Sequence, residues 1–167
     1  MTRLALVLMA TSGLGLMTAH GSAAQLSRQD QTFIDHAATS NVAEINAGQM
    51  AANKAASAPV KQLGETMVAD HTKANDQLAQ IAQQEGISLP TQPTAQQRAE
   101  AQKLMALNGT QFDQAFAQNE VQDHEKAIAE FRTEAKSGHD PALKSFAEQT
   151  IPVLQKHLRM AQGASRG

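Results

Sequence analysis

The sequence predicts an all-α protein built as an antiparallel four-helix bundle. Alanine and glutamine are abundant and β-branched residues are few, which favours helices. Apolar residues recur at three- and four-residue spacing in four long segments. Glycine, proline and aspartate stand between these segments, as expected at helix ends. The sequence contains no cysteine, which excludes disulfides, thiolate catalysis and cysteine-ligated zinc.

The first two long helices are predicted at 28–55 and 59–86. Ser27 is a suitable N-cap for the first helix, and Asp30 follows three residues later. Pro59 suits a first helical position, and Gly86 suits a helix end. Because the loop between the two segments is short, we expect them to form an antiparallel hairpin.

The last two long helices, predicted at 111–138 and 141–162, form a second hairpin for the same reason. Asp140 caps the fourth helix, and Pro141 occupies its first position. Pro152 lies inside this helix and should bend it, because proline lacks a backbone donor.

The connection between the hairpins, 87–110, is the longest. Its first part, ISLPTQPT, is predicted to be extended, and 95–107 is predicted to be a short helix capped by Thr94. At 1.5 Å per residue that helix is roughly 20 Å long, so the connection can run the length of a bundle. Both a crossover and simple up-and-down threading are compatible with it.

The N-terminus has the three-part pattern of a secretory signal peptide, predicted at 1–24. Arg3 precedes an apolar run, 4–17, and Ser22 and Ala24 suit the residues before a cleavage site. This run is shorter than the ~20 residues that span a bilayer. We therefore expect a protein exported to the periplasm or cell envelope, with one domain over 25–167 and no membrane span after cleavage.

The charge and aromatic content exclude several functions. Without Arg3 there are 13 Lys and Arg against 16 Asp and Glu, which provides no basic face for nucleic acid. There is no Trp or Tyr and there are only 5 Phe, so base-stacking platforms are not expected either. No Ser-His-Asp pattern or phosphate-binding glycine loop is present, so the sequence indicates no catalytic residues and no enzyme class.

Each predicted long helix has at least one ionisable residue on its apolar stripe, at 100° per residue. His36 falls outside this stripe, and Asp70 falls at its edge. Counted from the helix ends, the inward-facing residues lie near mid-height, within about one helical turn of 5.4 Å. We therefore expect one buried polar layer, made by Glu44, His71, Glu120, His124 and His157.

This layer predicts a site for one transition-metal ion, Zn, Fe, Cu or Mn. The three imidazoles would be its nitrogen ligands and Glu44 its oxygen ligand, while Glu120 completes or supports the site. Ferritin-like bundles build metal sites from inward Glu and His, but their Glu-x-x-His units are absent, which favours one ion over two. Supporting roles are expected for Asp70 and Asn75, which can orient an imidazole, and for Met67, a thioether suited to cuprous ion.

Two alternatives remain open at the level of the sequence. The buried residues can form a metal-free hydrogen-bond network that specifies helix register. Such a bundle could act in an envelope stress response or by docking to a protein partner, although the sequence indicates no apolar patch for one.

Four segments of the chain resemble a known family. They are VAEINAGQMA, VKQLGETMVADHTKANDQL, NGTQFDQAF and PALKSFAEQTIPVLQKHLRMA. Together they resemble the bacterial domain-of-unknown-function family 4142 over about residues 29–162. The most specific features are the DH in the second helix, the GxxFD that opens the third and the PxLxxH in the fourth.

The resemblance implies an exported, ferritin-like four-helix bundle with a long crossover, containing a short helix, between the second and third helices. It implies no established activity. Members are often labelled putative outer membrane proteins, which we interpret as envelope location only, because a bundle with polar outer faces cannot span a membrane. The family's recurring polar positions correspond to Glu44, Asp70, His71, His124 and His157, with Glu120 as a companion.

Overall fold

Five α-helices and no strands make up residues 26–166, the part of the chain that the computed structural model describes. The all-α prediction is therefore confirmed. None of these helices is both long enough and apolar enough to cross a bilayer. The predicted signal peptide lies outside the described residues. The helices are α1 (Arg28–Lys54), α2 (Ala58–Glu85), α3 (Ala95–Met105), α4 (Gly109–Ser137) and α5 (Pro141–Ala164).

Local capping interactions fix most of the helix starts where the sequence predicts them. The Ser27 side chain accepts a hydrogen bond from the Asp30 amide, and Asp140 caps α5 in the same way. Thr94 begins α3 with a capping box. Helix α4 begins two residues earlier than predicted, because the Phe112 amide already donates to the Asn108 carbonyl, 3.3 Å away.

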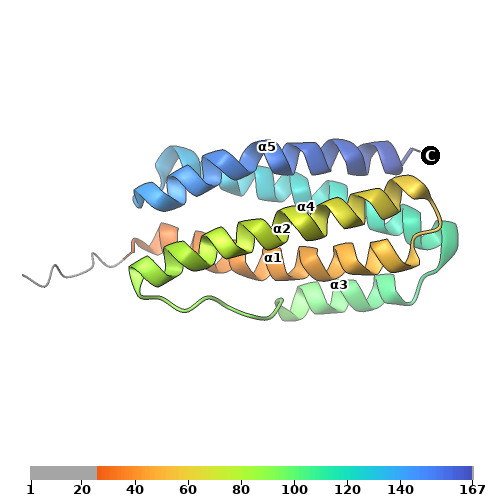
Figure 1. Ribbon diagram of the computed structural model, residues 1–167, viewed down its shortest axis with the longest axis horizontal. Helices are drawn as coiled ribbons and strands as arrows, with labels where there is room; N and C mark the ends of the chain where they lie inside the picture. Colours follow the sequence, from red (N-terminus) through yellow and green to blue (C-terminus); the bar gives the residue numbers. More distant parts are fainter. Residues whose placement is uncertain (1–25, 167) are drawn as a thin grey trace, which may run out of the picture.

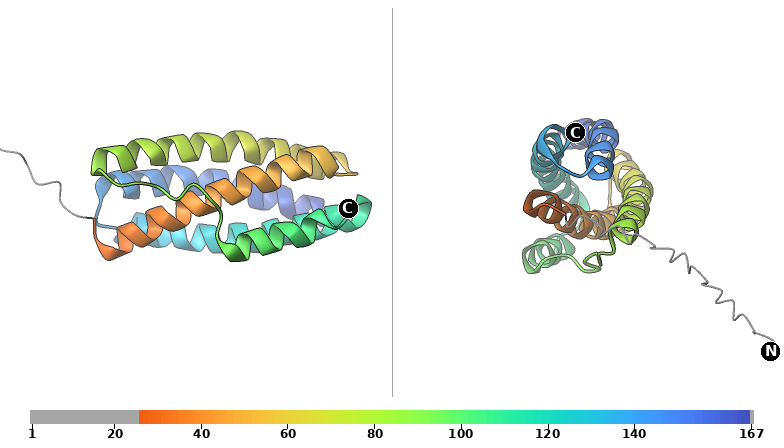
Figure 2. Two further views of the ribbon diagram at one scale, coloured as in Figure 1. Left: turned by 90° about the horizontal axis from the view of Figure 1, so that it is seen from below. Right: turned by 90° about the vertical axis from the view of Figure 1, so that its left-hand side faces the viewer.

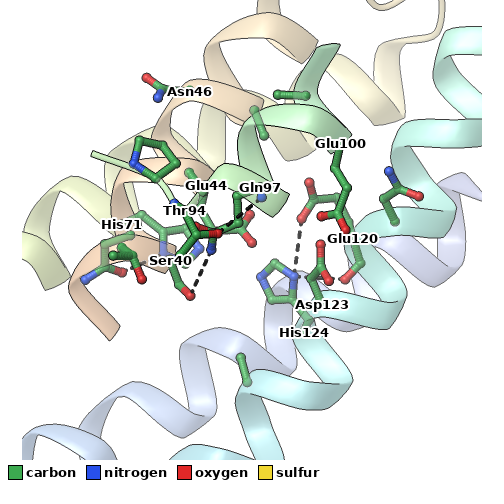
Figure 3. Close-up of a pocket in the computed structure, with 18 of the residues that line it drawn as sticks. Ser40, Glu44, Asn46, His71, Thr94, Gln97, Glu100, Glu120, Asp123 and His124 are labelled. Atoms are coloured by element: carbon green, nitrogen blue, oxygen red, sulfur yellow. Dashed lines mark hydrogen bonds and ion pairs between the residues drawn. The ribbon is translucent and has the colours of Figure 1, made fainter. Parts of the chain in front are cut away.

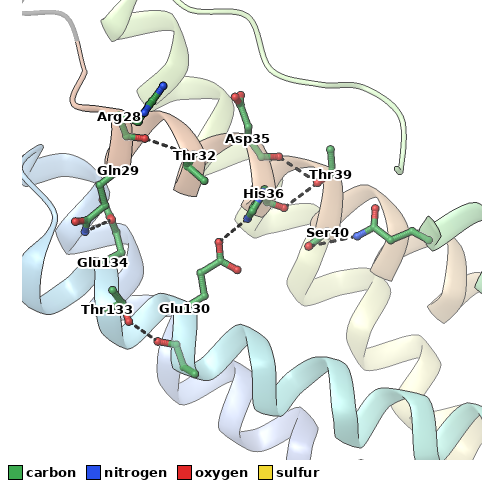
Figure 4. A network of polar contacts seen from close by, with 12 residues as sticks. Arg28, Gln29, Thr32, Asp35, His36, Thr39, Ser40, Glu130, Thr133 and Glu134 are labelled. Atoms are coloured by element: carbon green, nitrogen blue, oxygen red, sulfur yellow. Dashed lines mark hydrogen bonds and ion pairs between the residues drawn. The ribbon is translucent and has the colours of Figure 1, made fainter. Parts of the chain in front are cut away.

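The four long helices lie side by side along one axis (Figure 1). Helices α1 and α2 form one hairpin and α4 and α5 the other, and α2 also packs on α5. The chain from α2 to α4 returns along the outside of the bundle, where α3 lies beside α1 and α4 (Figure 2). Polar contacts join α1 to α4 directly (Figure 4). Among them are His36 Nδ1 to Glu130 Oε1 and Gln29 Nε2 to Glu134 Oε2, each 3.1 Å.

Two apolar clusters fill the bundle, one toward each end. Cluster I includes Phe33, Ile34, Leu78, Phe131 and Phe146. Cluster II includes Ala51, Leu63, Met67, Phe112 and Phe116. Along every long helix the predicted polar residues fall between the residues of these two clusters. The expected polar layer at mid-height is therefore present, with apolar packing above and below it.

Candidate metal centre

Three buried histidines from three helices meet in the polar layer. His71 on α2, His124 on α4 and His157 on α5 are 6%, 1% and 0% exposed. One ring nitrogen from each lies within 4.8 Å of the other two. The ring centroids of His71 and His124 are 5.9 Å apart, and His157 is 5.3 Å from both. This spacing brings three imidazoles around one common point.

Each imidazole is held by a hydrogen bond on the side away from that point. His71 Nδ1 lies 3.0 Å from Asn41 Oδ1. His124 Nδ1 lies 2.9 Å from the carbonyl oxygen of Glu120, one turn earlier on α4. His157 Nε2 lies 2.9 Å from Asp70 Oδ2. Histidines that bind metals almost always donate their other ring nitrogen to such an oxygen, which fixes the tautomer and the ring orientation.

These three partners determine where the ring protons are. An amide oxygen, a carbonyl oxygen and a carboxylate oxygen all accept, so each of the three contacting nitrogens donates. In a neutral ring the other nitrogen is then bare, which means that it carries no proton and has a free lone pair. The bare nitrogens are Nε2 of His71, Nε2 of His124 and Nδ1 of His157. His124 Nε2 and His157 Nδ1 face each other at 3.2 Å, and His71 Nε2 is buried without a hydrogen-bond partner.

Burial keeps two of these rings neutral. Loss of water, with smaller effects from the other two imidazoles, lowers the pKa of His71 well below its usual value. Burial also lowers the pKa of His157 to about 4, although its hydrogen bond to Asp70 opposes the shift. Burial opposes ionisation of Asp70 too, but contacts with His157 and Lys156 outweigh it and lower the pKa of that carboxyl. Neutral imidazole is the form that binds a metal ion.

A pair of carboxyl groups lies beside the histidines. Oxygens of Glu44 on α1 and Glu120 on α4 lie within 4.8 Å of each other and of a ring nitrogen of His124. Burial raises the pKa of Glu120 to about 8. Burial, and then the neighbouring Glu120, raises the pKa of Glu44 well above its usual value. One oxygen of each group is buried without a hydrogen-bond partner, which is costly unless a donor or a cation reaches it.

The structure divides the five predicted ligands into two groups that share His124. One group holds the three imidazoles, and the other holds the two glutamates with His124. Sequence reasoning assigned Glu44 to the first group, where the structure does not place it. Both glutamates line a cavity on the α3 side of the bundle, whereas His157 does not.

The supporting residues differ in part from the prediction. Asp70 orients an imidazole, as expected. The amide that orients His71 is Asn41 on α1 rather than the predicted Asn75. Sequence reasoning missed Asn41, although the apolar residues Ile34 and Gly48 lie seven residues before and after it, which is about two helical turns, and both are buried on α1. Met67 is fully buried in cluster II, where it fills the apolar core.

A cavity of about 690 Å³ leads from the α3 side of the bundle to this layer. Its lining includes His71, His124, Glu44 and Glu120, as well as residues of α3 and Thr94 before it (Figure 3). His157 is not among the lining residues. The histidine cluster is therefore closed on the α5 side and approachable from the side that α3 covers.

A family model described as "Domain of unknown function (DUF4142)" matches residues 15–164. The chain belongs to the DUF4142 family. This confirms the resemblance found in its four segments. No curated protein matches the sequence.

The DUF4142 chain is also similar to a DUF305 fragment from Deinococcus radiodurans whose crystal structure is known. The match has a TM-score of 0.74 and 16% sequence identity, and it covers 86% of this chain and 100% of that chain. At this level of identity the likeness concerns the fold alone.

Proposed function

We propose that this DUF4142 protein binds one transition-metal ion through His71, His124 and His157. The observation that supports this most directly is the set of three bare nitrogens, each on a ring whose other nitrogen is hydrogen-bonded. Two nitrogens bound to one tetrahedral ion at 2.0–2.1 Å are about 3.3 Å apart. The distance between His124 Nε2 and His157 Nδ1 is 3.2 Å.

A proton would satisfy the three bare ring nitrogens less well than a metal ion would. It would have to convert one of the facing rings into an imidazolium. The pKa of His157 is lowered to about 4 by burial, so that cation is disfavoured at neutral pH. A proton between two nitrogens also leaves His71 Nε2 without a partner. A metal ion satisfies all three nitrogens, and imidazole suits zinc, copper, iron and nickel.

The carboxyl pair is assigned to the surroundings of the ion. Glu44 and Glu120 group with His124 alone. The ion therefore has three nitrogen ligands from the protein, and its fourth coordination position faces the cavity. Ionised carboxyls beside the ion would offset its charge. An incomplete protein ligand set of this kind is typical of metal sites that exchange a ligand with solvent.

The proposal includes a ferritin-like arrangement and an exported location. The position of α3 beside α1 and α4 supports a crossover between the hairpins, and inward Glu and His side chains are how ferritin-like bundles build metal sites. The basic start and apolar run of the sequence support cleavage after residue 24 and a periplasmic or envelope location.

The experiment is metal analysis of the purified protein, combined with thermal unfolding. We expect close to one equivalent of metal and a melting temperature that rises with added Zn²⁺, Cu²⁺ or Fe²⁺, because an ion that binds only the folded state stabilises it. A His71→Ala, His124→Ala double variant should lose both properties. Asp70→Asn should lower metal affinity by about 10- to 100-fold, because it leaves the His157 ring poorly oriented.

His36→Ala is the matched control. Its side chain is 61% exposed, pairs with Glu130 and is not part of the cluster, so metal content should not change. A protein that contains no metal, and whose melting temperature is the same with and without each ion, would contradict the proposal. The metal-free hydrogen-bond network would then be the better description of the layer.

A further inference from the structure

The closed end of the cavity is polar, while much of its wall is apolar. Four side chains that line it each have a buried polar atom without a hydrogen-bond partner. Those atoms are Asn41 Nδ2, Glu44 Oε2, His71 Nε2 and Glu120 Oε2. The proposed metal ion accounts for the histidine nitrogen only. The two carboxyl groups, on facing helices α1 and α4, hydrogen-bond to each other, and no other donor reaches these two oxygens.

A ligand that brings N–H donors or positive charge would satisfy these oxygens. Glu120 is 3% exposed, and the nearby ring donor His124 Nδ1 already donates to the Glu120 carbonyl. Its carboxyl oxygen Oε2 is 3.4 Å from that nitrogen. An anionic ligand would be repelled by the pair, and a hydroxyl would supply one donor for two oxygens. An ammonium group supplies three donors and a charge.

The wall of the cavity indicates what else the ligand contains. Apolar side chains from several helices line the cavity, among them Ala47, Met50, Ala101, Leu104, Phe131 and Leu154. A volume of about 690 Å³ is in the range of cavities that hold small organic molecules. An amine on an apolar body can use both the carboxyl pair and these apolar side chains.

We infer that the cavity between α1, α3 and α4 binds a small primary amine with an apolar body, its ammonium group between the carboxyl groups of Glu44 and Glu120 (Figure 3). This site does not depend on the metal ion. It also tolerates one, because the ammonium group and a divalent ion each favour the ionised form of the two glutamate carboxyls.

The test is calorimetric titration of the purified protein, before and after removal of metal by a chelator, with n-hexylamine, n-hexanol and hexanoate. We expect the amine to bind at least tenfold more tightly than the alcohol, and hexanoate not to bind, in both preparations. A Glu44→Gln, Glu120→Gln double variant should bind the amine at least tenfold more weakly. Because the metal-free preparation tests amine binding alone, its result does not depend on whether the protein binds a metal ion.

Two further variants make the outcome decisive. Glu125→Gln is the matched control, because Glu125 is an exposed residue of α4 that does not line the cavity, and its amine affinity should be unchanged. Ala101→Trp fills the cavity from the α3 side and leaves both carboxyl groups in place. We expect it to lower the affinity for the amine at least tenfold and to leave the metal content unchanged. Circular dichroism checks that each variant is folded. Equal affinity for hexylamine and hexanol, or full amine binding by the Glu44→Gln, Glu120→Gln variant, would overturn the inference.

Discussion

The buried ionisable residues of the polar layer hold protons differently in the folded and unfolded chain. In the absence of metal, burial raises the pKa of Glu120 from 4.5 to about 8, and lowers that of His157 from 6.5 to about 4. The two shifts affect stability in opposite directions. The glutamate stabilises the folded state at low pH and this contribution is lost as pH rises toward 8, whereas the histidine contribution is lost as pH falls from 6.5 toward 4.

Substituting Glu120 isolates its share of this pH dependence. Between pH 4.5 and about 8 the folded metal-free protein holds a proton that the unfolded chain has lost. For this group the free energy of unfolding should therefore fall as pH rises, by up to about 1.4 kcal/mol per pH unit. We expect Glu120→Gln to gain stability relative to the native protein as pH rises from 5 to 8, measured by urea unfolding.

The control for that measurement is Glu125→Gln, which replaces an exposed carboxyl on the same helix. Its stability should follow that of the native protein at every pH. A Glu120→Gln variant whose difference from the native protein is constant from pH 5 to 8 would mean that this carboxyl ionises normally in the folded state.

At the scale of helices, α1 and α2 approach each other closely where two glycines face each other. A Cβ placed on Gly48 would lie 2.7 Å from the Gly64 carbonyl oxygen, and one on Gly64 would lie 2.6 Å from the Gly48 carbonyl oxygen. Both contacts are with backbone, which cannot turn aside as a side chain can. This close approach sets the distance between α1, which holds Asn41 and Glu44, and α2, which holds His71.

Replacing either glycine with alanine should therefore push the hairpin apart. We expect Gly48→Ala and Gly64→Ala each to lower the free energy of unfolding by roughly 2 kcal/mol, as overpacking in a tight core does. Gly163→Ala is the control, because nothing lies within 4 Å of its added Cβ. It lies in helix α5, so it should raise stability by up to about 1 kcal/mol through helix propensity. Equal effects at all three positions would contradict this account.

At the scale of the whole molecule, a buried aspartate joins the two hairpins at each end of the bundle. Asp30, in the first turn of α1, accepts from the His139 amide in the loop between α4 and α5, at 2.8 Å. Asp113, near the start of α4, accepts from the Ala56 and Ser57 amides between α1 and α2, at 3.1 and 2.7 Å. Each hairpin thus caps the loop of the other, which fixes their relative height and aligns the polar layer.

Removing either aspartate should loosen this alignment. Asp30→Ala and Asp113→Ala should each lower the free energy of unfolding by about 2 kcal/mol, because each removes hydrogen bonds to a charged group. Asp76→Ala, at an exposed position of α2, should change it by less than about 0.5 kcal/mol. Chemical denaturation measures all three, and an effect of Asp113→Ala no larger than that of Asp76→Ala would rule out a structural role for this contact.

The sequence by itself determined the helices and the residues that face inward. Caps such as Ser27 and Asp140, and the spacing that places Glu120 and His124 on one face, act within one or two turns, so they can be identified from neighbouring residues alone. The mid-height level of the layer also followed from counting along each helix.

Only the tertiary structure decided how the layer is divided. Which ring nitrogen faces which partner depends on the rotation of each helix and on side-chain rotamers, and neither has a sequence signature. For this reason the pairing of His71 with Asn41, the separation of Glu44 from the three imidazoles and the cavity beneath α3 could not be foreseen. Each is a contact between side chains from different helices, whose positions are fixed by packing across the bundle rather than by the local chain.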